Sequence, residues 1–305
     1  MAFFRFALFA IVALPCLASA QPAPAPSEDV TVTGTKSRQV IAHFVSSFAK
    51  PTRMTGKIAR WEIALCPVTA GLRPGANRFV TQRVREIAAK IGAPVSDKAS
   101  CTPNIAIEFT TTPQALLDTI RKQKPSILGY YDNSNQLAKL ATVTRPIQSW
   151  YATATKDVDG GIEPDRAVKN GIGLALDRDG EPGKFVFPNA TAVHVTGSHL
   201  GDGLRSTFLN IVIIADRNSL ANYELGAIGD YISLLALSQL NDLEACQELP
   251  SIVNLLASSC GRKVDAITDN DLGYLRGLYK MGPDRTMRSQ QDEIAYQMEQ
   301  SLTGR

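Results

Sequence analysis

Apolar residues recur along the chain with two different periods, and each period predicts a different kind of element. Residues 58–65 (IARWEIAL) and 104–109 (NIAIEF) alternate apolar and polar side chains, which is the period of a half-buried strand. Residues 148–155 predict a further strand. The β-branched run at residues 207–215 (TFLNIVIIA) predicts a central strand that is buried on both faces.

Other segments of the first half place apolar residues three and four apart, as an amphipathic helix does. One such stripe runs over residues 80–91, with Asn77 as the expected cap and Gly92 as the expected end. Pro113 at a first helical position predicts a second helix, which continues over residues 113–122.

The second half of the chain predicts three more helices. A long helix is expected at residues 219–240, capped by Ser219. Its inner positions are apolar or small: Leu225, Ile228, Ile232, Leu235 and Ala236. Asp269 is the expected cap of a last core helix, and an amphipathic segment follows at residues 289–302.

The order of these elements predicts a single α/β or α+β domain with a mixed sheet at residues 40–285. Residues 156–206 form an irregular insertion that is rich in Gly, Asp and Pro. Within it only residues 184–186 and 192–195 look like strands. Residues 286–305 are expected to form an amphipathic tail helix.

The first 20 residues have the three parts of a cleavable secretory signal. Arg5 supplies the positive start, residues 6–17 are apolar, and Ala18-Ser19-Ala20 provides the small residues of a cleavage site. The apolar run is shorter than the stretch of about 20 residues that spans a bilayer. We therefore expect a signal peptide at residues 1–20, a Pro/Ala-rich and polar leader at residues 21–39, and a secreted or periplasmic protein without a transmembrane segment.

The cysteine count agrees with export. Four cysteines follow the expected signal peptide, and an even number in an oxidising compartment suggests two disulfides, for which three connectivities exist. The pairs Cys66–Cys101 and Cys246–Cys260 are favoured, because each lies within one half of the chain.

Composition and charge are those of an ordinary globular protein. Hydrophobic residues make up 44% of the chain and charged residues 20%, and the net charge of +3 calls for no anionic partner. The polar face of the helix expected at residues 80–91 carries three basic residues, Arg78, Arg85 and Lys90. We interpret that face as solvated and expect no nucleic-acid partner.

Histidines, the commonest zinc ligands, are few. The chain has three, and His43 stands alone, so we expect it to be structural. His194 and His199 are five apart and Asp202 follows them. Strand residues on one face are separated by even numbers, so these three side chains are expected to be surface polar groups, with a metal site as the alternative.

Two acidic segments have part of a calcium-loop pattern. Asp157-Val-Asp159-Gly-Gly and Asp177-Arg-Asp179-Gly-Glu181 place carboxylates two apart beside glycine. Neither continues to the distal glutamate of an EF-hand loop, and turns use the same residues. Motifs for other chemistry are missing: the sequence has no G-x-S-x-G elbow, and its glycine-rich residues 197–203 lack the G-K-[ST] ending of a phosphate loop.

The C-terminal third resembles a family of enzymes. Residues 229–237 (GDYISLLAL) are similar to the active-site helix of matrixin-type zinc proteases, H-E-x-x-H-x-L-G-L. Residues 250–254 (PSIVN) are similar to the S-I-M turn beneath the metal, and residues 267–279 resemble the closing helix. More closely, the whole chain resembles a family of exported proteobacterial domains of unknown function with this degenerate zincin-like pattern.

The resemblance implies a zincin-like fold whose catalytic positions have changed. Gly229 and Ser233 stand where the zinc-binding histidines would be, Asp230 where the catalytic glutamate would be, and Val253 in the position of the methionine. Zinc selects neutral imidazole, which neither glycine nor an isolated serine replaces. We therefore expect a pseudoenzyme without a cofactor, zinc and calcium being the alternatives.

The expected partner is an envelope protein or peptide, bound in a vacated cleft between the helix at residues 229–237 and the sheet. Two other interpretations remain. One is a metal-dependent hydrolase or peptidase with an unconventional site made of His194, His199 and Asp202. The other is a structural or adhesive envelope protein that uses residues 156–206.

Overall fold

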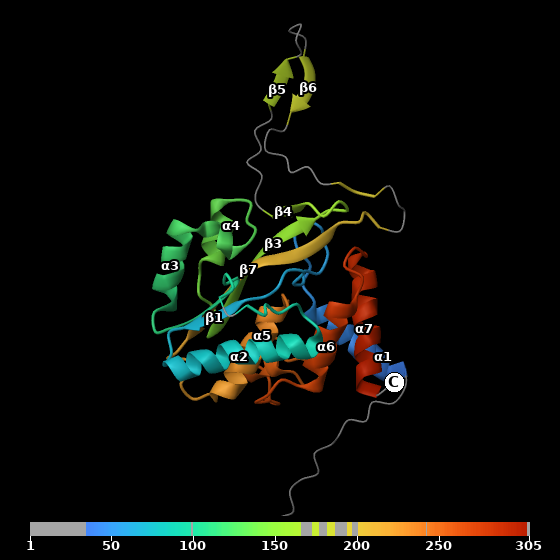
Figure 1. Cartoon of the computed structure of the whole chain (residues 1–305). Helices are drawn as coiled ribbons and strands as arrows, with labels where there is room; N and C mark the ends of the chain where they lie inside the picture. Colours follow the sequence, from blue (N-terminus) through green and yellow to red (C-terminus); the bar gives the residue numbers. More distant parts are fainter. Residues whose placement is uncertain are drawn as a thin grey trace, which may run out of the picture. The chain divides into compact units, whose positions relative to one another are not determined.

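A computed structural model describes residues 35–98, 100–165, 173–176, 182–186, 194–196, 201–241 and 243–303. The expected signal peptide and most of the expected leader lie outside these residues, as do the candidate His199 and the acidic segment at residues 177–181. Within the described part, the chain forms mixed α/β structure around an open, mixed sheet (Figure 1).

The sheet has five strands in the order β1-β2-β7-β3-β4. Their bounds are β1 (Pro67–Ala70), β2 (Ile105–Thr110), β3 (Ile147–Lys156), β4 (Ile162–Pro164) and β7 (Arg205–Asp216). The first three in this order are parallel, while β3 is antiparallel to β7 and β4 is antiparallel to β3. The prediction of a mixed sheet is therefore confirmed. A separate hairpin is formed by β5 (Gly173–Leu176) and β6 (Pro182–Val186).

The central strand β7 is buried on both faces, as its β-branched run predicts. Its alternate residues enter two different cores, because successive side chains of a strand point to opposite faces. Ile211 and Ile213 belong to the larger core, and Val212 and Ile214 belong to the smaller one.

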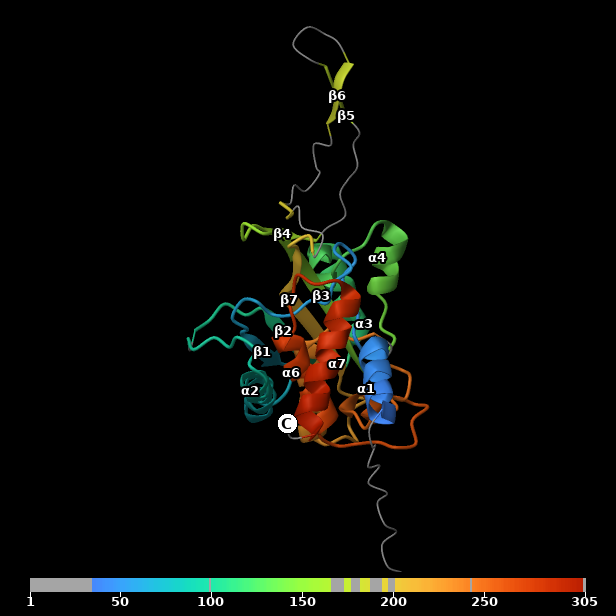
Figure 2. The ribbon, with the colours of Figure 1, turned by 90° about the vertical axis from the view of Figure 1, so that its right-hand side faces the viewer.

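The larger core lies between the sheet and a group of helices (Figures 1 and 2). These helices are α1 (Thr35–Phe48), α2 (Pro74–Ile91), α5 (Leu225–Leu237), α6 (Asp269–Lys280) and α7 (Met287–Thr303), with the 3-10 turn η2 (Ile252–Leu255). α5 contacts both α2 and β7, whereas α7 packs against α6 and α1. The predicted tail helix is thus part of the domain: its Ile294 and Met298 are buried in the core.

The smaller core covers the other face of the sheet. It is closed by α3 (Pro113–Gln123), the 3-10 turn η1 (Pro125–Leu128) and α4 (Ser134–Leu140). Leu117 of α3 and Leu128 of η1 meet Trp150 of β3 there. The helix expected after Pro113 is confirmed.

Residues 58–65 do not form the expected strand. They make only isolated bridges, and the strand β1 begins at Pro67, where the sequence predicts an end. Their alternation has another cause, which is packing: Trp61 is buried and donates from Nε1 to the carbonyl of Ala236, 2.8 Å away. Proline is compatible with the first residue of an edge strand, because its missing N–H is not needed there.

Three expected helix caps are displaced. α2 begins at Pro74, and Asn77 bonds Leu72 at both its backbone N–H and its carbonyl, each at 3.1 Å. α5 begins only at Leu225, because Ser219 lies in a turn and donates to the carboxylate of Asp216. α6 is capped by Thr268 in a capping box, one residue before the predicted cap.

Two boundaries also shift. α1 begins at Thr35, inside the segment that composition assigns to the leader. The insertion at residues 156–206 contains β4, β5 and β6, and residues 194 and 195 form no strand, while residues 192 and 193 lie outside the described part.

Both favoured disulfides are present. Cys66 is joined to Cys101, and Cys246 to Cys260, with Cα–Cα distances of 6.0 and 4.8 Å. None of the helices in the described residues is long and apolar enough to cross a membrane. The two disulfides are compatible with an exported protein.

Candidate functional site

The helix face that the resemblance makes catalytic is closed. Every residue of α5 from Ala227 to Leu237 is buried, including the three positions of the degenerate motif. A helix that is apolar all round belongs in a core rather than at the wall of a cleft. No open face therefore remains on Ala227–Leu237 to form the wall of the expected cleft, and α2 is one of the segments that pack against this helix.

Asp230 holds the two helices together. Its carboxylate is 3% exposed and accepts hydrogen bonds from Nε and Nη2 of Arg83 on α2. The backbone N–H of Ile267, just before α6, donates to Oδ2 at 2.8 Å. The bond from Asp230 raises the pKa of Arg83 above its ordinary value. A carboxylate with these partners connects three segments inside the protein and is shielded from solvent.

The two positions that would carry zinc ligands also face inward. A Cβ added to Gly229 would lie 3.6 Å from Cγ of Arg83 and 3.6 Å from Cε1 of Phe79, both on α2. Ser233 is fully buried and donates its hydroxyl to the carbonyl of Gly229 at 2.7 Å. Both positions therefore serve helix packing and a hydrogen bond within the helix.

The segment that resembles the turn beneath the metal forms η2, which packs against α5. Val253, in the methionine position, is fully buried. Asp271 of α6 anchors the turn, because its carboxylate accepts from Oγ of Ser251 at 2.5 Å and from the N–H of Ile252 at 2.9 Å. Burial raises the pKa of Asp271 above its ordinary value in spite of these bonds.

The candidate group of His194 and Asp202 is not assembled into one site. His194 pairs through Nδ1 with Asp159, and this bond raises the pKa of the imidazole. Asp202 pairs with Lys57 instead. His199 lies outside the described residues. In the described ranges no three His, Cys, Asp or Glu side chains are grouped so that they could hold a metal ion.

The first acidic segment forms a turn. Asp157 accepts from the backbone N–H groups of Asp159 at 3.1 Å and Gly161 at 2.7 Å. The N–H of His194 also donates to this carboxylate, at 3.4 Å. Burial acts to raise the pKa of Asp157, but these hydrogen bonds bring it below its ordinary value. The carboxylate thus closes its own turn, as the Asp-Gly pattern predicts.

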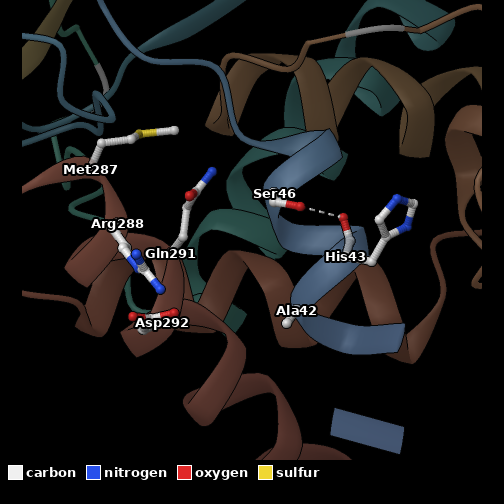
Figure 3. A pocket seen from close by; sticks show the side chains of 7 residues that line it. All are labelled: Ala42, His43, Ser46, Met287, Arg288, Gln291 and Asp292. Atoms are coloured by element: carbon white, nitrogen blue, oxygen red, sulfur yellow. Dashed lines mark hydrogen bonds between the residues drawn. The ribbon is translucent and has the colours of Figure 1, made fainter. Parts of the chain in front are cut away.

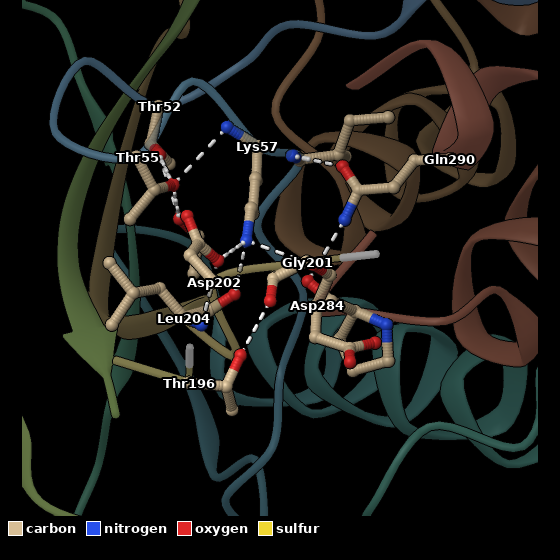
Figure 4. Close-up of polar contacts among 12 residues, drawn as sticks. Thr52, Thr55, Lys57, Thr196, Gly201, Asp202, Leu204, Asp284 and Gln290 are labelled. Atoms are coloured by element: carbon tan, nitrogen blue, oxygen red, sulfur yellow. Dashed lines mark hydrogen bonds and ion pairs between the residues drawn. The ribbon is translucent and has the colours of Figure 1, made fainter. Parts of the chain in front are cut away.

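A buried lysine is the centre of a polar cluster that joins distant segments (Figure 4). The ammonium of Lys57 donates to the carboxylate of Asp202, to the carbonyl of Leu204 at 2.6 Å and to the carbonyl of Asp284 at 2.9 Å. Its three N–H groups are all used. Partial burial disfavours ionisation of Asp202, but Lys57 and the N–H of Leu204 lower its pKa below the ordinary value. This cluster stabilises the fold.

A shallow groove runs between α1 and α7 and measures about 590 Å³ (Figure 3). His43 is one of its lining residues. Its imidazole is 71% exposed and lies 3.5 Å from Glu248, and its backbone carbonyl accepts from Ser46. The histidine that we expected to be structural is therefore a surface residue.

A deeper pocket of about 490 Å³ lies beside β3, near the carboxyl end of α5; we call it the β3 pocket. Five segments contribute to its lining: residues 50–53, 128–130, 140–145, 148–153 and 239–243. Its volume is within the range of small-molecule sites. Gly129 brings η1 close to β3: its φ is 92°, and an added Cβ would lie 2.6 Å from the carbonyl oxygen of Tyr151.

The charges that line the β3 pocket are all positive. Lys50, Arg53 and Arg145 line it, and no Asp or Glu does. Arg53 pairs with Asp132 and lies over the ring of Tyr130, with 5.5 Å between Cζ and the ring centroid. Burial and then the charge of Arg145 lower the pKa of Lys50. Sequence reasoning did not find these residues, because they come from separate loops and share no motif or spacing.

Comparison with known proteins adds no relative to this description: no family model, no curated protein and no solved structure matches the chain.

Proposed function

We propose that this protein is an exported, non-catalytic binding domain on a zincin-like scaffold. The arrangement of α5, η2 and α6 supports the scaffold, because η2 packs against α5 as a turn beneath an active-site helix would. The expected signal peptide and the two disulfides support export.

One observation carries the non-catalytic half of the proposal. The position of the catalytic glutamate is occupied by Asp230, whose carboxylate is buried and bonded to Arg83 and to the N–H of Ile267. A general base must reach a substrate or water proton at about 3 Å. Asp230 is separated from solvent by α2, and the residues one and three positions away on α5 are a glycine and a buried serine.

The binding half rests on the β3 pocket. It lies at the carboxyl end of the same helix and has the size of a ligand site. Because the motif face of α5 is buried, the β3 pocket is the better place for a ligand.

The test combines metal analysis with a peptidase screen on the mature protein. We expect less than stoichiometric zinc after purification without chelator, and equal background hydrolysis of a mixed peptide library with and without EDTA. The variant Asp159→Asn, which removes the partner of His194, serves as a control and should change neither result.

Stoichiometric zinc that is lost in His199→Ala or in His194→Ala would favour the hydrolase with the unconventional site. Chelator-sensitive peptide turnover by the purified protein would contradict the proposal in the same way.

A further inference from the structure

We propose that the β3 pocket binds a small carboxylate ligand that carries a neighbouring hydroxyl or amide N–H donor. This inference rests on the proposed binding function and names the chemistry of its ligand. It follows from which polar groups of the pocket have partners and which do not.

The wall that carries the unused groups is rigid. Residues 48–50 run beside residues 239–241 in an antiparallel bridge between Ala49 and Leu240. The N–H of Lys50 donates to the carbonyl of Gln239 at 3.2 Å, and the N–H of Asn241 donates to the carbonyl of Phe48 at 3.0 Å. Three adjacent side chains, Lys50, Gln239 and Asn241, line the pocket from this wall.

The positive charge of this wall is uncompensated. Within the described residues, the ammonium of Lys50 has no hydrogen bond or ion pair, while the nearby Arg145 is held by Glu244 at a distance of 3.3 Å. The charge of Arg145 contributes to the lowered pKa of Lys50, and two neighbouring positive charges attract an anion to the space between them. A guanidinium prefers the planar, two-oxygen geometry of a carboxylate.

The same wall offers an unused acceptor. The side-chain oxygen of Gln239 is buried and has no hydrogen-bond partner. A buried acceptor without a donor costs about 1–3 kcal/mol, so a rotation of the Gln239 side chain that brings this oxygen to the pocket surface would let a ligand O–H or N–H satisfy it. A ligand that matches both features has an anionic group and a donor a few atoms away.

The other polar groups of the pocket are already used. The hydroxyl of Tyr151 donates to the carbonyls of Leu235 and Ser238, at 2.9 and 3.1 Å. Thr153 donates to Asp165, and the side chain of Gln148 is bonded to Thr144 and Thr142. These groups shape the floor, so recognition falls to Lys50, Gln239 and Asn241, with the ion-paired Arg145 beside them.

A volume of about 490 Å³ accommodates a molecule of the size of a monosaccharide or a dipeptide. Two sources share the proposed chemistry: an acidic sugar, whose donor is a hydroxyl, and a peptide C-terminus, whose donor is a backbone N–H. Four probes separate the parts of the inference: D-glucuronate, its neutral amide D-glucuronamide, N-acetylglycine, and acetate.

The experiment is isothermal titration calorimetry of the mature protein with each probe, supported by NMR shifts of the Lys50 side chain. We expect D-glucuronate or N-acetylglycine to bind at least about tenfold more tightly than acetate, and D-glucuronate to bind about tenfold more tightly than D-glucuronamide. Either donor-bearing probe supports the proposal, and the tighter one identifies the source.

Lys50→Met should weaken binding about tenfold or more, since the ammonium contributes a charge-assisted contact. Lys122→Met removes the same charge from the exposed surface of α3 and should leave the affinity unchanged. Circular dichroism of both variants controls for folding.

Two results would overturn the inference: no binding of any carboxylate probe at millimolar concentration, or equal affinity in the wild type and in Lys50→Met. Acetate binding as tightly as both larger acids would overturn the part played by Gln239. None of these outcomes changes the zinc and peptidase results, so failure of this inference is distinguishable from failure of the proposed function.

Discussion

Polar side chains lie at the middle of α5 and also beside its carboxyl end. The two groups differ in whether their members have hydrogen-bond or ion-pair partners inside the protein. At the middle, Asp230 meets Arg83 and the N–H of Ile267, so charge and hydrogen bonds are satisfied inside the protein. At the carboxyl end, Lys50 has no acidic partner among the described residues and the oxygen of Gln239 has no donor.

This difference separates a structural polar cluster from a binding site. A buried pair whose members satisfy each other stabilises one arrangement of the chain and leaves nothing for a ligand. Polar groups that line an open pocket without protein partners are hydrogen-bonded to water in the free protein, and a ligand can replace that water. Polarity alone therefore does not identify the site, whereas unsatisfied polarity does.

The largest expected effect is the loss of the pair at the middle of α5. Asp230→Ala should lower the free energy of unfolding by about 3–4 kcal/mol, because the backbone N–H of Ile267 loses its acceptor and Arg83 is left with the longer pair to Glu86 at 3.9 Å. Urea unfolding measures the change, and Asp118→Ala, at an exposed position of α3, should stay within about 0.5 kcal/mol of the wild type. If Asp230→Ala changed the free energy of unfolding as little as the control does, Asp230 would not be the residue that connects the three segments.

The second effect concerns the covalent link beyond the carboxyl end. Cys246 and Cys260 are 14 residues apart, and opening a loop of this length costs about 3 kcal/mol in the chain-entropy model. The double variant Cys246→Ser/Cys260→Ser should unfold at correspondingly lower urea concentration. It should leave the ion pair of Asp230 intact. Asp230→Ala should therefore lower the free energy of unfolding by the same amount in the double variant as in the wild type.

A third effect tests the charge of the β3 pocket by its pH dependence. The pKa of Lys50 lies below its ordinary value of 10.5, because of burial and then the charge of Arg145. Binding of D-glucuronate requires the protonated amine, so affinity should fall as the pH rises through this lowered pKa, while bound anion raises the pKa in return.

Two tyrosines also line the pocket, and the pKa values of Tyr130 and Tyr151 are both raised above their ordinary value. Lys50→Arg should therefore bind D-glucuronate at pH 8 as tightly as the wild type does. Between pH 8 and pH 10 its affinity should fall much less than that of the wild type. A decline that persists in this variant would assign the titration to another group.

The smallest effect distinguishes two helical glycines. Gly229→Ala places a methyl group at ordinary contact distance from Arg83 and Phe79, so the higher helix propensity of alanine should stabilise the protein by about 0.5 kcal/mol. In Gly277→Ala of α6 the new Cβ lies 2.8 Å from the carbonyl oxygen of Ile294, so this variant should be less stable than the wild type. Thermal unfolding of both variants measures the difference in sign.

Local patterns in the sequence predict much of the fold. The β-branched run of β7, the alternation of β2, and the helix that ends at Gly92 are confirmed, because each depends on residues close in the chain. The cap of α6 was misplaced by one residue, since Thr268 and Asp269 are both suitable, and the caps expected for α2 and α5 were wrong because these helices begin after Arg73 and Glu224 without a side-chain cap.

The candidate site was less predictable. The motif positions 229, 230 and 233 follow from spacing along one helix, but their burial depends on the approach of α2, which is about 150 residues earlier in the chain. The β3 pocket has no motif, because Lys50, Arg145 and Gln239 come from three separate segments. The lack of a partner for the ammonium of Lys50 and for the side-chain oxygen of Gln239, within the described residues, is a property of the packed molecule.

By itself, the sequence determines the periods of the strands and helices, the small residues Gly229 and Ser233 four apart on one helix, and the two cysteine pairs that each lie within one half of the chain. These features depend on residue chemistry and short separations. Only the tertiary structure decides that α2 covers Asp230 and that an unpaired lysine faces a pocket, because both depend on which distant segments come into contact and on which polar groups are satisfied there.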